Sequence, residues 1–275
     1  MIKFAVMGFG TVGAGVAEIL QKNSALLEER LGEPIDLKYI LDIRDFPDSP
    51  FSNRVVHDFE TIVKDEEVDV VVETIGGAKV AYDYTKRALL AGKHVVTSNK
   101  ELVATHGCEL LKIAEEKNVN YLFEAAVGGG IPVLRPLHQC LAANEIEEVF
   151  GILNGTTNYI LTRMVRAGVT FEAALREAQS LGYAEQDPTA DVEGHDACRK
   201  ICILADLAFG REILPEDVPT EGISGVTLRD VELVEKAGWR VKLLGRALRQ
   251  EDGRVSAYVA PHLVRAEHPI AGVED

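Results

Sequence analysis

The first twenty residues, MIKFAVMGFGTVGAGVAEIL, decide the fold of the amino-terminal half. An apolar run over residues 2–7 is followed at once by GFGTVG at residues 8–13, and an amphipathic stretch begins directly after it. This spacing fits GxGxxG between a buried strand and a helix, which is the arrangement of a dinucleotide-binding turn. A glycine-rich turn without ligand is the plainer alternative. The predicted cofactor-binding residues of the turn are Gly8, Gly10, Thr11, Val12 and Gly13.

The alternation of short apolar runs with helical periods continues to about residue 130. Strands are predicted over residues 2–7, 35–41, 68–73, 94–97 and 121–125, and an amphipathic helix over 101–117. Such alternation is typical of a parallel sheet with helices on its faces. We therefore predict a Rossmann-type, doubly wound α/β domain over residues 1–130.

The pattern changes after the GGGIP segment at residues 128–132. A long, mostly helical stretch reaches residue 210, and two alternating stretches separated by QEDG close the chain. Alternation on both sides of a short turn predicts antiparallel strands. The strands predicted here cover residues 149–153, 239–248 and 254–264. We expect an α+β domain over residues 131–275.

Composition excludes several classes of function. The chain has 275 residues, 47% of them hydrophobic, and a formal net charge of −15, so a polyanion such as nucleic acid is disfavoured as a partner. The cysteines show no CxxC spacing, which favours a reducing compartment. No apolar run approaches the roughly 20 residues that span a bilayer. We expect a cytoplasmic protein.

Polar residues follow the predicted parallel strands where each one ends. Asp42 offers a carboxylate for ribose hydroxyls, which favours NAD, whereas Arg44 offers a guanidinium for the 2′-phosphate of NADP. Thr74 follows the third long strand, and Ser98 and Lys100 follow the next. Ligands bind at this edge of a parallel sheet. The cofactor choice stays open on these residues. Lys100 at the end of a strand is more suggestive of a site than a surface lysine, and an ordinary solvated lysine is the alternative.

A polar segment, GYAEQDPTADVEGHDACRK, runs from a loop into a helix. Asp196 and Lys200 are four residues apart, so on a helix they share a face and the carboxylate can orient the ammonium. An exposed ion pair is the alternative interpretation, and it would contribute only about 0.3–0.5 kcal/mol. The carboxylates expected to attract a substrate ammonium are Glu185, Asp187 and Asp191.

The segment LNGTTNYI joins the end of a predicted strand to the start of a helix. Backbone N–H groups at such a start can hold a carboxylate. N-capping of the helix by Thr156 or Thr157 needs only one hydroxyl and is the alternative. Both interpretations can hold together.

Four segments resemble one family. NGTTNYILTRM and GYAEQDPTADVEGHDACRKICILA resemble segments of homoserine dehydrogenases, in the same order behind GFGTVG and TSNKEL. The resemblance spans the whole chain and implies an NAD(P)-binding domain followed by a domain for substrate binding and dimerisation. It also implies interconversion of L-aspartate 4-semialdehyde and L-homoserine in threonine and methionine biosynthesis, by a homodimer.

The resemblance assigns roles to individual residues. The implied catalytic residues are Lys200, Lys100 and Asp196, and the implied substrate-binding residues are Gly155, Thr156, Tyr183, Glu185 and Asp191. Arg44 resembles a basic residue that family members use near the 2′-phosphate, which favours NADP over NAD. The chemistry is compatible, because reducing an aldehyde requires a hydride and a proton for the developing alkoxide, and a lysine ammonium can supply that proton.

EAAVGGGI resembles the family's monovalent-cation loop. The resemblance implies a carboxylate and backbone carbonyls as ligands, at Glu124, Val127, Gly129 and Ile131. Hard oxygen ligands of this kind suit Na+. From spacing alone the segment is a glycine hinge.

Two other functions remain open on the sequence. A phosphorylating semialdehyde dehydrogenase would need a cysteine nucleophile with a base, and the cysteines lie mostly among apolar residues of predicted helices. A dinucleotide sensor without turnover would need neither lysine. Finally, the closing HPIAGVED resembles a segment after which family members continue, so we expect a shortened chain or a divergent short form.

Overall fold

The chain divides into two compact units in this computed structural model, which describes residues 1–274. The first unit covers Met1–Pro132 and the second begins at Val133. The sequence predicts the boundary at residue 130. Among the described residues, no helix combines the length and apolarity needed to cross a membrane.

A parallel six-stranded sheet, in the order β3-β2-β1-β4-β5-β6, forms the centre of the first unit. Its strands are β1 (Ile2–Met7), β2 (Ile35–Leu41), β3 (Val55–Val56), β4 (Val70–Glu73), β5 (His94–Thr97) and β6 (Tyr121–Leu122). The order reverses direction between β1 and β4, and ligands bind in the crevice at the carboxyl ends of strands at such a point. The predicted doubly wound α/β fold is confirmed.

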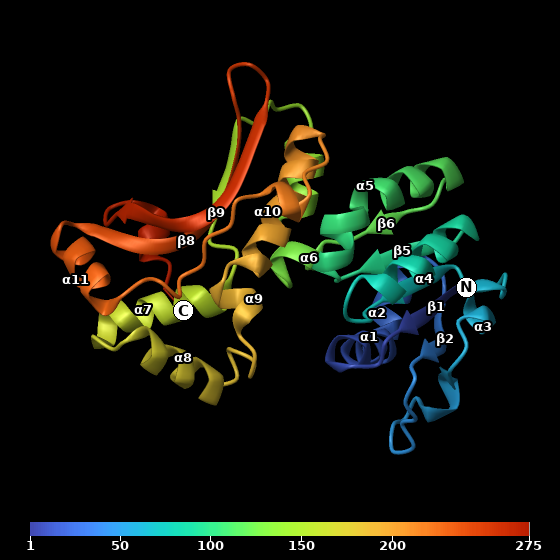
Figure 1. Cartoon of the computed structure of the whole chain (residues 1–275). Helices are drawn as coiled ribbons and strands as arrows, with labels where there is room; N and C mark the ends of the chain where they lie inside the picture. Colours follow the sequence, from blue (N-terminus) through green and yellow to red (C-terminus); the bar gives the residue numbers. More distant parts are fainter. Residues whose placement is uncertain (275) are drawn as a thin grey trace. The chain divides into compact units, whose positions relative to one another are not determined.

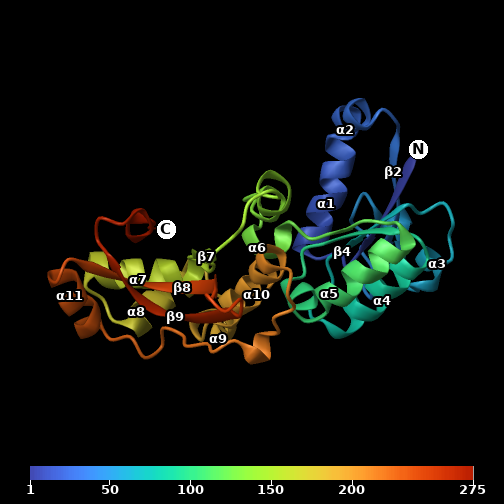
Figure 2. The ribbon, with the colours of Figure 1, turned by 90° about the horizontal axis from the view of Figure 1, so that it is seen from above.

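Helices cover both faces of this sheet. They are α1 (Thr11–Lys22), α2 (Ser24–Leu31), α3 (Glu60–Val63), α4 (Lys79–Leu90), α5 (Lys100–Lys117) and α6 (Ala125–Gly128). Figure 2 shows α1 and α2 on one face and α4 and α5 on the other. The apolar stripe of α1 packs at Ala17 against Val6 and Ile40, which are fully buried. Burial of these stripes on the sheet holds the glycine turn at its edge.

Two predicted strands are shorter in the structure, and one strand was not predicted. The strand expected over residues 68–73 begins only at Val70. The strand expected over residues 121–125 ends at Leu122, because the chain turns into α6 and Ala126 N–H donates to the Phe123 carbonyl at 2.9 Å. The unpredicted strand β3 has two residues, too few to show a period.

The second unit is built on an antiparallel three-stranded sheet in the order β7-β8-β9 (Figure 1). Its strands are β7 (Glu148–Gly151), β8 (Trp239–Arg249) and β9 (Val255–Arg265), and its helices are α7 (Gly155–Ala167), α8 (Phe171–Ser180), α9 (Thr189–Val192), α10 (His195–Phe209) and α11 (Leu228–Lys236). A Cβ at Gly245 of β8 would lie 3.2 Å from the Ile201 Cβ of α10. A glycine there lets α10 pack closely against the sheet.

The short helical segments complete the two units. They are η1 (Ser52–Arg54), η2 (Pro136–Cys140), η3 (Pro215–Asp217) and η4 (Pro269–Gly272). The α+β character predicted for the second unit is confirmed, with β7, β8 and β9 each within one residue or two of the predicted ranges.

Candidate dinucleotide and substrate sites

The glycine turn is tightly packed at its ends and open in its middle. A Cβ at Gly13 would lie 1.9 Å from the Gly8 carbonyl oxygen, and a Cβ at Gly8 would lie 2.7 Å from the Thr74 carbonyl oxygen. A Cβ at Gly10 would meet nothing within 4 Å. Gly8 and Gly13 are therefore required by the protein itself, whereas the space above Gly10 is available to a ligand. This geometry fits a pyrophosphate approaching the backbone.

Asp42 and Arg44 form a hydrogen-bonded pair, so they do not act as competing determinants of NAD and NADP binding. Both oxygens of the Asp42 carboxylate accept hydrogen bonds: Oδ2 from Phe9 N–H at 2.8 Å and from Arg44 Nη2 at 3.1 Å, and Oδ1 from Arg44 Nε at 3.0 Å. The Arg44 guanidinium, helped by the N–H groups of Phe9 and Arg44, holds the pKa of Asp42 at about 2 against the opposing effect of burial. Asp42 thus braces the glycine turn and orients Arg44.

A cavity of about 540 Å³ opens at this edge of the first unit. Four of the predicted cofactor residues line it, namely Gly8, Gly10, Arg44 and Thr74. Thr11, Val12 and Gly13 open α1 beside it, and Ser98 and Lys100 lie at the carboxyl end of β5. The cavity has the chemistry of a dinucleotide site, with glycine backbone, a hydroxyl and a guanidinium on its wall.

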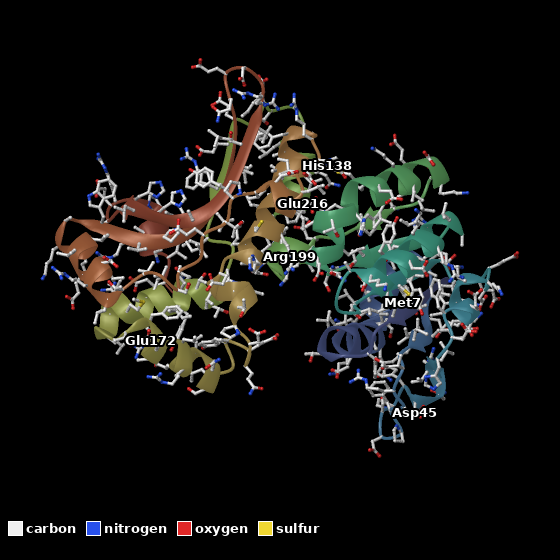
Figure 3. The ribbon with its side chains drawn as sticks, in the orientation of Figure 1. Met7, Asp45, His138, Glu172, Arg199 and Glu216 are labelled. Atoms are coloured by element: carbon white, nitrogen blue, oxygen red, sulfur yellow. The ribbon has the colours of Figure 1, made fainter. Side chains whose placement is uncertain are left out.

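His57 also lines this cavity, and sequence reasoning missed it. Its Nδ1 lies 2.7 Å from the Asp42 carbonyl oxygen, and its Nε2 lies 3.1 Å from Oδ1 of Asp45, which Figure 3 labels on the loop after β2. The Asp42 carbonyl, and then the Asp45 carboxylate, raise the pKa of His57 against partial desolvation. A histidine just after a two-residue strand leaves no periodic signal.

Lys200 and Asp196 lie on α10 as a buried ion pair. Lys200 Nζ donates to Asp196 Oδ2 at 2.8 Å and to the Leu153 carbonyl at 2.8 Å. The exposed fractions of the two side chains are 16% and 4%. Figure 3 labels Arg199, which marks the turn of α10 that carries Lys200. The exposed-pair interpretation is wrong, because both side chains are largely removed from solvent. Burial of such a pair carries a desolvation cost that a surface pair does not have.

Asn154 organises the rest of this cluster and was not singled out from the sequence. Its Nδ2 donates to Asp191 Oδ1 at 2.7 Å and to Asp196 Oδ2 at 2.9 Å, and its Oδ1 accepts from Thr157 N–H at 2.9 Å. Asn154 is therefore the N-cap of α7, and the alternative interpretation, capping by Thr156 or Thr157, is wrong. The Thr156 hydroxyl donates instead to the carbonyl of Tyr183, at 2.8 Å. An asparagine directly before a helix start was the available signal.

The other acidic residues of the segment stand outside this cluster. Asp187 Oδ1 accepts from the N–H and the hydroxyl of Thr189, so its carboxylate serves the start of α9. Glu185 is exposed and takes no part in the Asn154 network within residues 1–274. The Tyr183 ring is exposed and meets the Tyr159 ring edge to face at 5.1 Å. The structure thus pairs Lys200 directly with the Asp196 carboxylate, and Asn154 links Asp196 to Asp191.

The predicted cation loop is a tight turn at the end of the first unit. Gly129 adopts φ +57°, Val127 is buried and Ile131 is 69% exposed. Residues 1–274 contain no cluster of three or more His, Cys, Asp or Glu side chains that could hold a metal. A site here would rest on Glu124 and backbone carbonyls, a hard oxygen set that suits a monovalent cation.

The two cysteines of α10 are buried, which disfavours a role for them in thioester chemistry. Cys198 and Cys202 are 3% and 0% exposed on α10, where the Cys198 thiol lies 3.6 Å from the Pro215 carbonyl oxygen.

The fold and the candidate sites together define the class of protein to which this chain belongs. The first unit is a dinucleotide-binding α/β domain, and the second is an α+β domain with a largely buried lysine held by the Asp196 carboxylate and the Leu153 carbonyl.

The family follows from comparison with known proteins. Residues 8–124 match the family model described as homoserine dehydrogenase, NAD binding domain, and residues 132–275 match the model described as homoserine dehydrogenase. The chain belongs to the homoserine dehydrogenase family, so the resemblance seen in its motifs is confirmed.

Relatives match along the whole chain. A homoserine dehydrogenase of Bacillus subtilis is 42% identical over 100% of this chain and 64% of its own length. The structure of a homoserine dehydrogenase from Thiobacillus denitrificans superposes with a TM-score of 0.93 at 42% identity, covering 99% of this chain and 64% of that one. A hyperthermophilic archaeal homoserine dehydrogenase in complex with NADPH superposes with a TM-score of 0.80 at 27% identity, covering 100% of this chain and 85% of that one. The chain spans less than two thirds of the length of the curated relatives it matches.

Proposed function

We propose that this chain carries homoserine dehydrogenase activity, the NAD(P)-dependent interconversion of L-aspartate 4-semialdehyde and L-homoserine. The observation that carries the proposal is the buried Lys200–Asp196 pair, which Asn154 joins to Asp191, in a member of this family. A reaction that creates and removes an alkoxide needs a positioned group that exchanges a proton, and a lysine held in this way can serve.

Lys200 is proposed as the acid and base of the reaction. When bound, the nicotinamide supplies or accepts the hydride. In the reducing direction the Lys200 ammonium gives a proton to the developing alkoxide, and in the oxidising direction the neutral amine takes it back. Asp196 and the Leu153 carbonyl fix the amine in place. Lys100, the first residue of α5, is proposed as the second lysine of the reaction.

The substrate amino acid offers an ammonium and a carboxylate to the second unit. We assign the ammonium to Asp191, with Glu185 as a second, exposed carboxylate. We assign the substrate carboxylate to the backbone N–H groups where α7 begins, at Gly155 and Thr156, and Tyr183 borders them through its carbonyl contact with Thr156.

An assay of NADPH oxidation with aspartate semialdehyde tests the function. Turnover in this direction, and NADP+ reduction with homoserine in the other, are expected. Dinucleotide binding without turnover of either substrate would favour a sensor instead. Phosphate-dependent formation of an acyl phosphate would favour the thioester enzyme.

NADP is proposed as the preferred cofactor, with NAD as the alternative. Arg44 lies on the cavity wall and its guanidinium is 59% exposed, so it can meet a 2′-phosphate while Asp42 holds it. The archaeal neighbour with NADPH supports this choice.

Replacing Arg44 by alanine is expected to lower kcat/KM for NADPH by about tenfold or more, because a charge-assisted contact with the phosphate contributes on the order of 1.5–3 kcal/mol. The value for NADH should change much less. Arg54→Ala is a matched control, since Arg54 pairs with Asp36 elsewhere in the unit. A preference for NADH that Arg44→Ala leaves unchanged would overturn the NADP proposal.

The remaining assignments belong to the same proposal. We propose that Na+ binds at Glu124 and the carbonyls of Val127, Gly129 and Ile131, in a structural role.

We propose a homodimer, with L-homoserine serving threonine and methionine biosynthesis in the cytoplasm. A net charge of −15 keeps nucleic acid disfavoured as a partner.

A further inference from the structure

A fully buried carboxyl lies at the end of β4, and the proposed reaction does not use it. Glu73 is 0% exposed and stands in register with Thr97, the last residue of β5, which is 2% exposed. A buried carboxyl is costly unless its oxygens are hydrogen-bonded. The hydrogen-bond partners of Glu73 therefore indicate which segments its carboxyl group connects.

The two oxygens of Glu73 hold two different segments. Oε1 accepts from Ile75 N–H at 2.7 Å, on the loop that follows β4. Oε2 accepts from the Thr97 hydroxyl at 2.5 Å, at the end of β5. Burial raises the pKa of Glu73, while the Thr97 hydroxyl, the Ile75 N–H and the Asn99 side chain act in the opposite direction. One side chain thus joins the ends of neighbouring strands.

Thr97 and Asn99 extend this connection to the start of α5. The Thr97 hydroxyl accepts from Asn99 N–H at 2.9 Å. Asn99 caps α5 by accepting from Leu102 N–H at 3.1 Å, and its Nδ2 donates to the Gly77 carbonyl at 2.7 Å. The first residue of the helix so anchored is Lys100. Two contacts therefore hold the loop after β4 to the segment before α5. The Glu73–Thr97 contact lies at the start of the loop, and the Asn99–Gly77 contact lies at its end.

We propose that Glu73 is a positioning residue that acts through Thr97 and Asn99, fixing the backbone of Lys100 against the loop 74–77 that borders the dinucleotide cavity. The inference deepens the proposed function and rests on the role given there to Lys100. A purely structural Glu73 would stabilise the sheet without affecting turnover. A misplaced catalytic group, by contrast, costs up to about a hundredfold in rate for a shift of about 1 Å.

Thr97→Val and Thr97→Ser test the connection through kinetics. Thr97→Val keeps the shape of the side chain but leaves Asn99 N–H and Glu73 without their shared partner. We expect kcat to fall by about tenfold to a hundredfold with KM for the semialdehyde within about twofold, because positioning is lost and substrate binding is not. Thr97→Ser keeps the hydroxyl and should restore kcat to within about threefold of the parent.

Two further variants separate positioning from stability. Asn99→Asp keeps the cap on Leu102 but loses the amide that donates to Gly77 and interacts with Glu73, so it should fold and still lower kcat. Tyr39→Phe is the matched control, because it removes one hydrogen bond to Asp65, outside the Glu73 connection. It should lower the melting temperature without lowering kcat. Equal effects of Thr97→Val and Tyr39→Phe on stability, with kcat unchanged in both, would overturn the proposal.

Hydrogen exchange on the free protein tests the same inference without turnover. Amide protons of Ile75 and Leu102 are expected to exchange about tenfold faster in Thr97→Val than in the parent, and amine labelling of Lys100 should change while that of the exposed Lys112 does not. Unchanged exchange and labelling would refute the positioning role even if the protein proved to be an active enzyme. Changed exchange in a protein without turnover would support the connection and refute only the proposed function.

Discussion

Lys200→Ala is expected to lower kcat by about a hundredfold or more in both directions of the reaction, the scale of lost acid and base catalysis. The variant removes the amine that donates to both Asp196 and the Leu153 carbonyl. Lys100→Ala and Asp196→Asn should each lower kcat in the same sense. Steady-state rates in both directions, with circular dichroism to verify folding, measure the effect.

Lys200→Arg is the informative partner of this variant. Arginine keeps the positive charge beside Asp196 and so preserves the buried pair, but a guanidinium does not release its proton at neutral pH. We expect near-parental stability together with a loss of homoserine oxidation. A Lys200→Ala or Lys200→Arg protein that folds and keeps near-parental kcat would remove Lys200 from the mechanism.

The second large effect is expected from a single methyl group at Gly13. A Cβ there would lie 1.9 Å from the Gly8 carbonyl oxygen, which belongs to the backbone and cannot move aside without opening the turn. Gly13→Ala should therefore destabilise the protein by about 3 kcal/mol, the upper end of the usual cost of overpacking, and abolish dinucleotide binding. Thermal unfolding and fluorescence titration with NADPH measure the two consequences.

Two neighbouring glycines provide matched controls. Gly10→Ala meets nothing within 4 Å, so it should fold normally yet weaken NADPH binding by about tenfold or more, since its methyl occupies the space left for the ligand. Gly15→Ala also meets nothing within 4 Å and lies inside α1, so it should stabilise the helix by roughly 0.5–1 kcal/mol and leave binding unchanged. Normal binding by Gly10→Ala would contradict the assigned path of the pyrophosphate.

Local patterns in the sequence were sufficient for the fold of each unit. The strand, the glycine turn and α1 are contiguous, so their spacing alone predicts a dinucleotide-binding turn. The period of the apolar residues likewise predicts the parallel strands and the antiparallel pair β8 and β9. The strand at Tyr121 ends at Leu122 because the chain turns there, and the spacing of apolar residues does not indicate such a turn. The predicted strand was therefore three residues too long.

The sequence by itself also determined that Asp196 and Lys200 share a face of a helix, because four residues make about one helical turn. Only the tertiary structure decided that this pair is buried, that Asn154 joins it to Asp191, and that Asp42 holds Arg44 instead of competing with it. The Glu73–Thr97 contact was also decided by the tertiary structure alone, because the two residues are 24 positions apart in the sequence. Local spacing sets which residues share one element, whereas burial and long-range hydrogen bonds depend on how separate elements pack, and no local pattern records that.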